Sequence, residues 1–194
     1  MGSGAKPMPR RALFLDRDGV INVDHGYVGR VADFAFVEDI FELVRMARRL
    51  NYLPVVVTNQ SGIARGYYSE EQFQAVTGFM LKRFADEGAA IERVYFCPSH
   101  PEATIARHRR EDPRRKPGPG MFLDAIAELD IDPACSAMIG DQWSDAVAAD
   151  AAGVAAIAIL GEPHGPAPTP VPTVTRIATV RDAIGWLASL KAQA

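Results

Sequence analysis

Short apolar segments alternate with longer segments of helical periodicity along most of this chain. The apolar segments are residues 12–16, 52–59, 94–98, 136–141, 155–160 and, more weakly, 174–179. Strands that are apolar on both faces and are separated by helices form βαβ units, which build parallel sheets covered by helices on both faces. We therefore expect an α/β fold with a doubly wound, Rossmann-like parallel sheet.

Helical spacing of apolar residues predicts helices over 39–50, 69–88, 118–129, 143–152 and 180–192. The helix after Ser69 has the clearest start, because Gln72 stands three residues later as the partner in a capping box. Its expected end is Gly88. The proline-rich stretch 161–172 should be a surface loop, since proline sustains neither a helix nor a central strand.

The size of the chain favours one compact unit. With 194 residues, of which 48% are hydrophobic, the chain can bury a sizeable core as one domain. We expect a flexible N-terminus at 1–9 and a single domain over 10–194. Too few residues separate the sequence motifs for a separate cap domain, so only the loops 22–30, 61–68 and 98–116 should border an active site.

The charge and the cysteine content narrow the range of partners. A net charge of -3 provides no basic field for nucleic acid, and no apolar stretch reaches membrane-spanning length. Cys97 and Cys135 are too few for a disulfide framework and are consistent with reduced thiols in a cytosol. We expect a cytoplasmic monomer whose partner is a small molecule, with no nucleic acid and no membrane.

Polar side chains gather where the predicted strands end. They are Asp16 and Asp18 after the first strand, Thr58 and Asn59 after the second, Lys116 after the third, and Asp141 and Asp145 after the fourth. Any one of them could simply cap a helix or make a turn. However, the carboxyl ends of parallel strands form the ligand-binding edge of such a sheet. The acidic clusters converging there would repel one another unless a cation lay among them.

Four stretches carry a family resemblance. "FLDRDGVIN", "VVVTNQSG", "RKPGPGM" and "MIGDQWSDAVAADAAG" resemble, in order, the four motifs of the haloacid dehalogenase (HAD) superfamily, and they span residues 11–153. The resemblance implies that Asp16 is a nucleophile forming an aspartyl-phosphate. Asp18 would be the general acid and base. Alternation in an extended chain would point both carboxylates toward one substrate, with the Arg17 side chain turned aside. Thr58 would bind the transferring phosphoryl group, and Lys116 would neutralise its charge.

The same resemblance implies a magnesium site. Its ligands would be a carboxylate oxygen of Asp16, the backbone carbonyl of Asp18 and a carboxylate oxygen of Asp141. Asp145 would support these groups without contacting the ion. The expected cofactor is therefore Mg²⁺.

Two further stretches of sequence indicate a sugar substrate. The stretches 22–28 ("NVDHGYV") and 58–73 resemble the D-glycero-D-manno-heptose 1,7-bisphosphate 7-phosphatases, which implies removal of the 7-phosphate in nucleotide-activated heptose biosynthesis. The substrate-binding residues would be Asp24, His25, Gly26, Tyr27, Asn59, Gln60, Ser61, Arg65 and, on the distal phosphate, Arg115. For His25 and Arg115, an interpretation without a role in binding stays open. His25 could be a surface-loop histidine, and Arg115 could belong to the solvated basic run 107–116.

The chain departs from that family at two places. Many members hold a structural zinc ion through Cys-x-His and Cys-x-Cys, but this chain has Cys97, Ser99, Asp112 and Arg114 at the corresponding positions. Only Cys97 of the set is retained, and Cys97, His100 and His108 would make a weak substitute, so we do not expect zinc. Gln142 also stands where the family often has lysine, so one cation of the family pattern is missing.

Two alternative functions remain. One is an enzyme acting on histidinol phosphate or another small phosphomonoester. The other is a receiver-like signalling protein, which would need one phosphoacceptor aspartate but no acid/base such as Asp18.

Overall fold

The computed structural model describes residues 10–170 and 172–190, so the expected flexible segment 1–9 lies outside the described residues. Six parallel strands form one sheet in the order β3-β2-β1-β4-β5-β6. They are β1 (Arg11–Leu15), β2 (Tyr52–Asn59), β3 (Arg93–Cys97), β4 (Ala137–Gly140), β5 (Ala156–Leu160) and β6 (Thr175–Ile177). The strand order runs outward from β1 in one direction and from β4 in the other, which confirms the expected doubly wound sheet.

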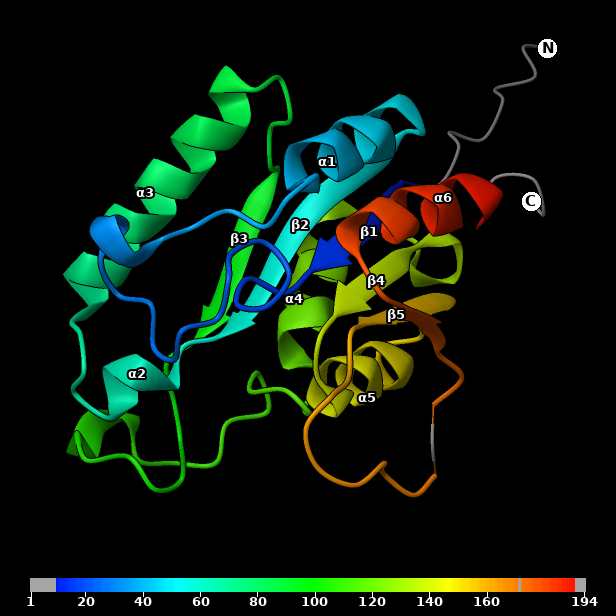
Figure 1. Cartoon of the computed structure of the whole chain (residues 1–194). Coiled ribbons are helices and arrows are strands. Elements are labelled where there is room, and N and C mark those ends of the chain that lie inside the picture. Colours follow the sequence, from blue (N-terminus) through cyan, green and yellow to red (C-terminus); the bar gives the residue numbers. More distant parts are fainter. Residues whose placement is uncertain (1–9, 171, 191–194) are drawn as a thin grey trace, which may run out of the picture.

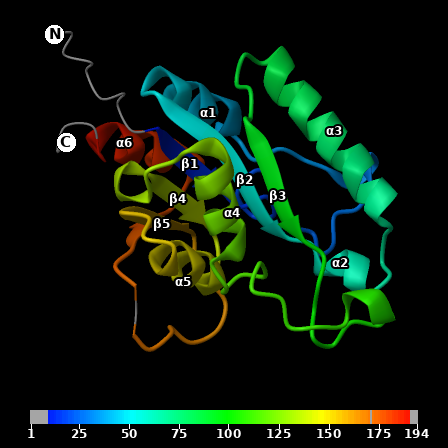
Figure 2. The same ribbon diagram turned by 180° about the vertical axis from the view of Figure 1, so that it is seen from behind.

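Helices cover both faces of the sheet. They are α1 (Ile40–Arg49), α2 (Ser61–Ala64), α3 (Glu70–Asp86), α4 (Gly120–Leu129), α5 (Trp143–Ala151) and α6 (Val180–Leu190). Figures 1 and 2 show α1 and α6 on one face and α4 and α5 on the other. The apolar residues of α3 belong to the same core cluster as those of α1 and α6. In the described residues, no helix is long and apolar enough to cross a membrane.

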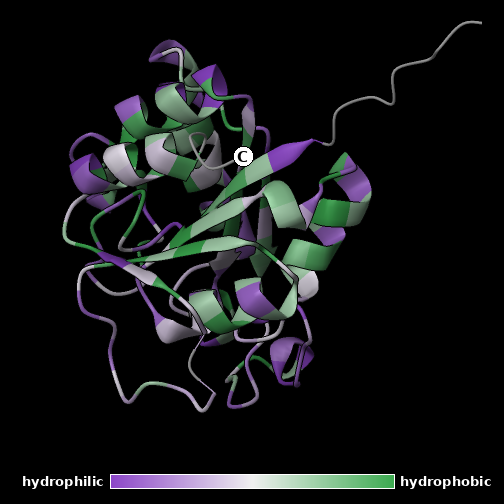
Figure 3. Ribbon diagram, turned by 90° about the vertical axis from the view of Figure 1, so that its right-hand side faces the viewer, coloured by the Kyte–Doolittle hydropathy of each residue, from purple (hydrophilic) through white to green (hydrophobic). Residues whose placement is uncertain are grey.

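Alternation along the central strand explains this two-sided packing. In β1, Leu13 and Leu15 join the core cluster beneath α1, α3 and α6, whereas Ala12 and Phe14 join the one beneath α4 and α5. All four side chains are fully buried. Successive strand residues point to opposite faces, so a strand buried on both sides must be apolar throughout. Figure 3 shows this as strands coloured mostly as hydrophobic.

The element boundaries lie close to the expected ones. The capping box of Ser69 and Gln72 starts α3 as predicted. Helix α4 begins two residues later than expected, at Gly120, with Pro119 as its N-cap residue. Four short elements lie inside expected loops: α2 and the 3₁₀ turns η1 (Val31–Asp33), η2 (Ala106–His108) and η3 (Pro133–Cys135). The described residues of the proline-rich stretch form a loop between β5 and β6, as expected.

Candidate active site

Asp16 lies directly after β1, at the carboxyl edge of the sheet. Its side chain is 2.9 Å from Nζ of Lys116, which is also 2.5 Å from Oδ1 of the Asp145 carboxylate. Lys116 Nζ donates a third contact, at 2.8 Å, to the Val57 carbonyl of β2. All three ionisable side chains are buried. One lysine therefore joins the end of β1, β2 and the start of α5.

Asn59 explains how a loop residue such as Lys116 reaches this position. The Asn59 side chain accepts from the Lys116 backbone N–H at 3.0 Å and donates to the Lys116 carbonyl at 2.9 Å. This two-point contact fixes the peptide groups of Lys116 against the end of β2. Sequence reasoning placed Asn59 with the substrate, and the structure adds that it anchors the lysine.

Three carboxylates gather around this lysine. Ligand oxygens of Asp16, Asp141 and Asp145 lie within 4.8 Å of one another. Asp145 is held by the backbone N–H groups of Asp141 and Gln142, at 3.2 and 3.0 Å. The Asp141 carboxylate packs closely against Gly19. A Cβ atom on residue 19 would lie 2.4 Å from Asp141 Oδ2, and Gly19 has a φ of +80°. The close packing at position 19 therefore requires glycine.

The carboxylates raise one another's proton affinity. Burial, opposed by Lys116 and reinforced by Asp145 and Asp141, raises the pKa of Asp16 well above its ordinary value. Burial and the neighbouring Asp145 raise the pKa of Asp141 to about 6. For Lys116, burial alone would lower the pKa, but the ion pairs with Asp145 and Asp16 raise it. Three carboxyl groups therefore share a single ammonium group as counterion.

The donor set of this cluster fits Mg²⁺. It consists of carboxylate oxygens, which are hard ligands preferred by this ion, and their mutual repulsion falls when a cation lies among them. Among the described residues, this is the one group of three or more His, Cys, Asp or Glu side chains close enough to share an ion. Asp145, engaged by Lys116 and two backbone N–H groups, has the least free coordination capacity.

Asp18 faces a different set of partners. The expectation that Arg17 turns aside is wrong: its side chain is only 1% exposed, and its Nη2 lies 2.8 Å from Asp18 Oδ1. Asn22 Nδ2 and Gln60 Nε2 also donate to the Asp18 carboxylate, at 3.0 and 3.2 Å. The two aspartates of the first motif thus lie in separate electrostatic surroundings, one beside a lysine and acids, the other inside a group of donors.

The sugar-pocket residues of the sequence analysis come together only in part. A cavity of about 310 Å³ is lined by Asp18, Asp24, Gly26, Tyr27, Asn59, Ser61, Gly62 and Tyr68. His25 instead lines an adjoining cavity of about 460 Å³, which shares Gly26 and Tyr27 with the first. Thr58 and Gln60 are buried beneath the first cavity, where Gln60 Nε2 donates to Thr58 Oγ1 at 2.8 Å.

Arg65 and Arg115 do not line this cavity and lie near His100. Arg65 Nη2 is 3.3 Å from His100 Nε2, and Arg115 and His100 line one cavity of about 480 Å³. Burial and the nearby Arg65 lower the pKa of Arg115, against the opposing effect of Cys97, Tyr27 and Glu111. In the described residues, neither arginine forms an ion pair with a carboxylate. The two guanidinium groups are therefore available to an anion.

The residues at the family's zinc-ligand positions contact other side chains of the protein. Ser99 Oγ donates to Asp112 Oδ2 at 2.8 Å, and Arg114 pairs with Asp124 at 2.9 Å. Cys97 is fully buried, as expected of a small apolar residue at a strand end. A serine hydroxyl and a guanidinium are not zinc ligands, so these residues do not fit that ion.

Sequence reasoning missed Arg17, Asn22 and Tyr68 as parts of the site. Arg17 and Asn22 lie in or beside the quoted first motif, but only the fold reveals that both reach back to Asp18. No sequence pattern distinguishes Tyr68 from its exposed neighbour Tyr67.

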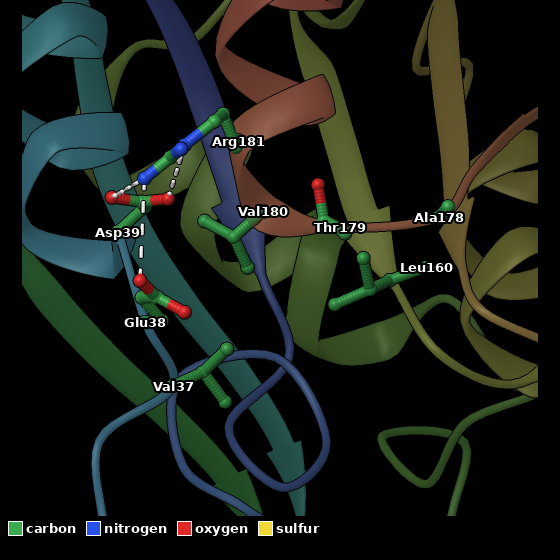
Figure 4. Close-up of a pocket in the computed structure, with 8 residues that line it drawn as sticks. All are labelled: Val37, Glu38, Asp39, Leu160, Ala178, Thr179, Val180 and Arg181. Carbon is green, nitrogen blue, oxygen red and sulfur yellow. Dashed lines mark hydrogen bonds and ion pairs between the residues drawn. The ribbon is translucent and has the colours of Figure 1, made fainter.

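Another pocket, of about 400 Å³, lies between the first turns of α1 and α6 (Figure 4). An ion pair of Arg181 and Asp39, at 2.9 Å, borders it. It contains none of the predicted site residues.

Comparisons with known proteins identify the family of this chain. Residues 113–183 match the HAD-hydrolase-like family model. The chain is 53% identical, over 76% of its length, to the D-glycero-alpha-D-manno-heptose-1,7-bisphosphate 7-phosphatase of Burkholderia mallei, of which 78% is covered. It is also 53% identical, over 76% of its length, to the D-glycero-beta-D-manno-heptose-1,7-bisphosphate 7-phosphatase of Vibrio cholerae, of which 79% is covered.

A solved structure is also similar to this chain in fold. The D,D-heptose 1,7-bisphosphate phosphatase from B. bronchiseptica, complexed with magnesium and phosphate, has a TM-score of 0.77 and 25% identity, covering 92% of this chain and 98% of that one. With the sequence relatives, this likeness settles the family. The chain belongs to the heptose 1,7-bisphosphate 7-phosphatase family of HAD-like phosphomonoester hydrolases.

Proposed function

We propose that this protein is a Mg²⁺-dependent phosphatase that removes the 7-phosphate of D-glycero-D-manno-heptose 1,7-bisphosphate, within nucleotide-activated heptose biosynthesis. Residues 10–194 would act as a single phosphatase domain. The observation that carries the proposal is the pairing of Asp16 with Lys116 beside Asp141, while Asp18 is held apart by its own donors. Such a site supplies a nucleophile, charge neutralisation and a separate proton carrier.

Asp16 attacks the phosphorus atom and forms an aspartyl-phosphate, while the bond to the sugar oxygen breaks. Lys116, 2.9 Å from Asp16, orients this carboxylate and offsets the negative charge of the phosphoryl group. Thr58 and the backbone N–H groups that follow it hydrogen-bond the phosphoryl oxygens. The placement of Asp16 and Thr58 at the carboxyl ends of the neighbouring strands β1 and β2, with Lys116 in contact with Asp16, supports these roles.

Asp18 moves the protons. It donates a proton to the departing sugar oxygen and then accepts one from the water molecule that hydrolyses the aspartyl-phosphate. This substrate needs an acid, because an alkoxide is a poor leaving group. A receiver-like protein has no use for a second carboxylate held in this way, so Asp18 favours turnover over signalling.

Mg²⁺, held by Asp16, Asp141 and the Asp18 carbonyl with Asp145 in support, would act as a Lewis acid on the phosphoryl oxygens. The sugar would lie against Asp24, His25, Gly26, Tyr27 and Ser61, above Asn59 and Gln60. Arg65 and Arg115 would meet the phosphate that is not cleaved. Because His25 lines the adjoining cavity, its contact with the sugar would come from that side.

The direct test measures phosphate release from heptose 1,7-bisphosphate, histidinol phosphate and an aryl phosphate. We expect the bisphosphate to have the highest kcat/KM. A higher kcat/KM for histidinol phosphate would replace the proposed substrate with the alternative, and no release from any of the three would contradict the phosphatase assignment.

Removal of the metal should abolish activity. Asp16 and Asp141 present negative charge to an anionic substrate, and only a cation can offset it during attack. We expect activity to disappear after exhaustive dialysis against EDTA and to return on addition of Mg²⁺. Full activity in the chelated protein would rule out the metal site.

Replacing Arg115 by Ala should impair bisphosphate turnover selectively. The guanidinium has no carboxylate partner among the described residues, so its loss removes a charge-assisted contact to the distal phosphate, worth about 1.5–3 kcal/mol. The measurement is kcat/KM for heptose 1,7-bisphosphate and for an aryl phosphate. The matched control is Arg109→Ala, an exposed residue of the same basic run.

The two outcomes that contradict this role differ in meaning. An equal loss with both substrates would assign Arg115 to the transferring phosphoryl group or to the structure of its loop. No loss with either would make it part of the solvated basic run.

A further inference from the structure

The Asp18 carboxylate is surrounded by donors that no substrate contact explains. Arg17 Nε donates to Asp18 Oδ1 at 3.2 Å. Arg17 Nη2 donates to Oδ1 at 2.8 Å and to Oδ2 at 2.9 Å. Asn22 adds a contact at 3.0 Å to Oδ1 and Gln60 one at 3.2 Å to Oδ2. Arg17, Asn22 and Gln60 are all buried. Three side chains thus fix both carboxylate oxygens of one partly exposed aspartate.

Each donor is itself held in place. Arg17 Nη2 also donates to the Val28 carbonyl at 2.9 Å, and the guanidinium lies 5.8 Å from the centre of the Phe73 ring. Asn22 is fully buried, and its amide also donates to the Val23 carbonyl at 3.0 Å. Because Asn22, Val23 and Val28 belong to the loop 22–30, these contacts tie the position of Asp18 to that loop.

Tyr68 controls the third donor. Its hydroxyl donates to Gln60 Oε1 at 2.6 Å, which leaves Gln60 Nε2 directed at Asp18 and Thr58. Burial raises the pKa of Tyr68 to about 12, so the hydroxyl stays protonated and remains a donor. Without it, the Gln60 amide could rotate and present its oxygen to the Asp18 carboxylate.

The Tyr68 ring is fixed by two glycines. A Cβ on Gly62 would lie 2.3 Å from the ring, and one on Gly29 would lie 2.4 Å from it. The ring therefore fills space that exists only because both residues lack a side chain. Gly29 lies in the loop 22–30 and Gly62 in α2, so Tyr68 packs between the two loops that border the cavity.

We infer that Arg17, Asn22, Gln60 and Tyr68, together named the Asp18 cage, are positioning residues, which hold the Asp18 carboxylate toward the leaving oxygen and couple its orientation to the loop 22–30. Their side chains contact neither the phosphoryl group nor the nucleophile and act through Asp18, whereas the backbone N–H of Arg17 donates to Asp16 Oδ1 at 2.7 Å. The inference rests on the proposed function, because it needs Asp18 to be the acid and base.

The test is Tyr68→Phe, which removes one hydroxyl and keeps the ring. An acid matters most when the leaving group is a poor one. We therefore expect the rate of phosphoryl transfer in a single turnover to fall about 10-fold with heptose 1,7-bisphosphate. It should change less than about 2-fold with an aryl phosphate, whose phenolate leaves without a proton. KM for the bisphosphate should stay within about 2-fold, since binding does not involve the hydroxyl.

Tyr95→Phe is the matched control. Tyr95 is also buried, and its hydroxyl donates to Glu128 at 2.7 Å on the opposite face of the sheet. Both variants remove one hydrogen-bonded hydroxyl from a buried tyrosine, so a general loss of stability would affect them alike. Only Tyr68→Phe should show a loss that depends on the leaving group.

A second variant, Arg17→Lys, tests a member of the Asp18 cage that donates to Asp18 directly. Lysine keeps the charge but cannot contact both Asp18 oxygens and the Val28 carbonyl through one planar group. The same leaving-group dependence is expected. If Tyr68→Phe and Arg17→Lys each lower the rate of phosphoryl transfer equally with both substrates, the positioning role of the Asp18 cage is wrong.

Asp18→Asn separates this inference from the proposed function. If the cage acts through Asp18, that variant shows the largest leaving-group dependence of the series. If Asp18→Asn loses nothing, the acid/base role has failed and the cage with it. If Asp18→Asn shows the dependence and neither Tyr68→Phe nor Arg17→Lys does, the cage alone is wrong.

Discussion

Asp16→Asn is expected to lower kcat by at least about 10⁴-fold, because the amide cannot attack phosphorus and no neighbouring group can take its place. Asp145 is engaged by Lys116 and two backbone N–H groups, and Asp18 is held by its cage. The substitution is isosteric, and Lys116 keeps its contacts to Asp145 and the Val57 carbonyl, so the fold should persist. The measurements are kcat with heptose 1,7-bisphosphate and a thermal melt.

Asp18→Asn should fail at a different step. With an aryl phosphate, which needs no acid, Asp16 should still be phosphorylated, but hydrolysis of the aspartyl-phosphate should slow by roughly 100-fold or more. Acid quenching should therefore trap phosphorylated protein in Asp18→Asn and not in Asp16→Asn. Asp150→Asn, an exposed position on α5, is the control for loss of one carboxylate. Substantial turnover by Asp16→Asn would remove the nucleophile from this mechanism.

The fold was predictable because its signal is repeated. Five of the six strands are short and mostly apolar, with β6 (Thr175–Ile177) the weak exception. Both faces of β1 are apolar, so the pattern predicts a parallel sheet without any distance information. The start of α3 was predictable from Ser69 and Gln72 because a capping box is a contact between residues near in sequence.

The residues at the ends of the strands were predictable as a group. Asp16, Lys116, Asp141 and Asp145 come from segments far apart in the chain, yet parallel strands bring their carboxyl ends to one edge. Their partners were not predictable to the same degree. The contact of Asn59 with the Lys116 backbone depends on the path of a loop, which has no periodic pattern.

The side-chain direction of Arg17 shows the limit most clearly. Alternation in an extended chain places Arg17 opposite Asp16 and Asp18, but the chain is no longer a strand at these positions. Backbone N–H groups of Ile21 and Asn22 donate to the Arg17 carbonyl and form a turn there. The long side chain then folds back to Asp18 and the Val28 carbonyl. A pattern of period two applies only while the strand lasts.

Lys116→Met should have the second largest effect, and it should act on stability as well as activity. The ammonium is buried and, among the described residues, is the one cation in ion-pair contact with Asp16 and Asp145. Removing one partner from a buried ion pair typically costs about 3–5 kcal/mol, because the remaining charge has neither water nor a counterion. We expect a loss of this size in the free energy of unfolding, measured by denaturant titration at about pH 7.5 with EDTA present.

Lys82→Met is the control for this variant. Lys82 pairs with Asp86 at 2.6 Å on α3, but its side chain is 73% exposed, so water can solvate the carboxylate that is left. Exposed pairs are worth about 0–1 kcal/mol, and the control should lose no more than that. A similarly small loss in Lys116→Met would show that the buried carboxylates do not depend on the lysine.

The pH dependence of Lys116→Met has a definite sign. In the wild type, the ion pairs raise the pKa of Lys116, so its stabilisation is fully present below its unfolded value near pH 10. Without the lysine, the pKa of Asp16, already raised by burial, should rise further above its unfolded value of about 4. A group with a raised folded-state pKa stabilises while protonated, and that contribution is lost as the pH rises through the folded-state value. The deficit of Lys116→Met against the wild type should therefore be smaller at about pH 5 than at about pH 8, and added Mg²⁺ should reduce it at the higher pH by supplying the missing positive charge. A deficit that grows as the pH falls would contradict the placement of Lys116 as the counterion of Asp16.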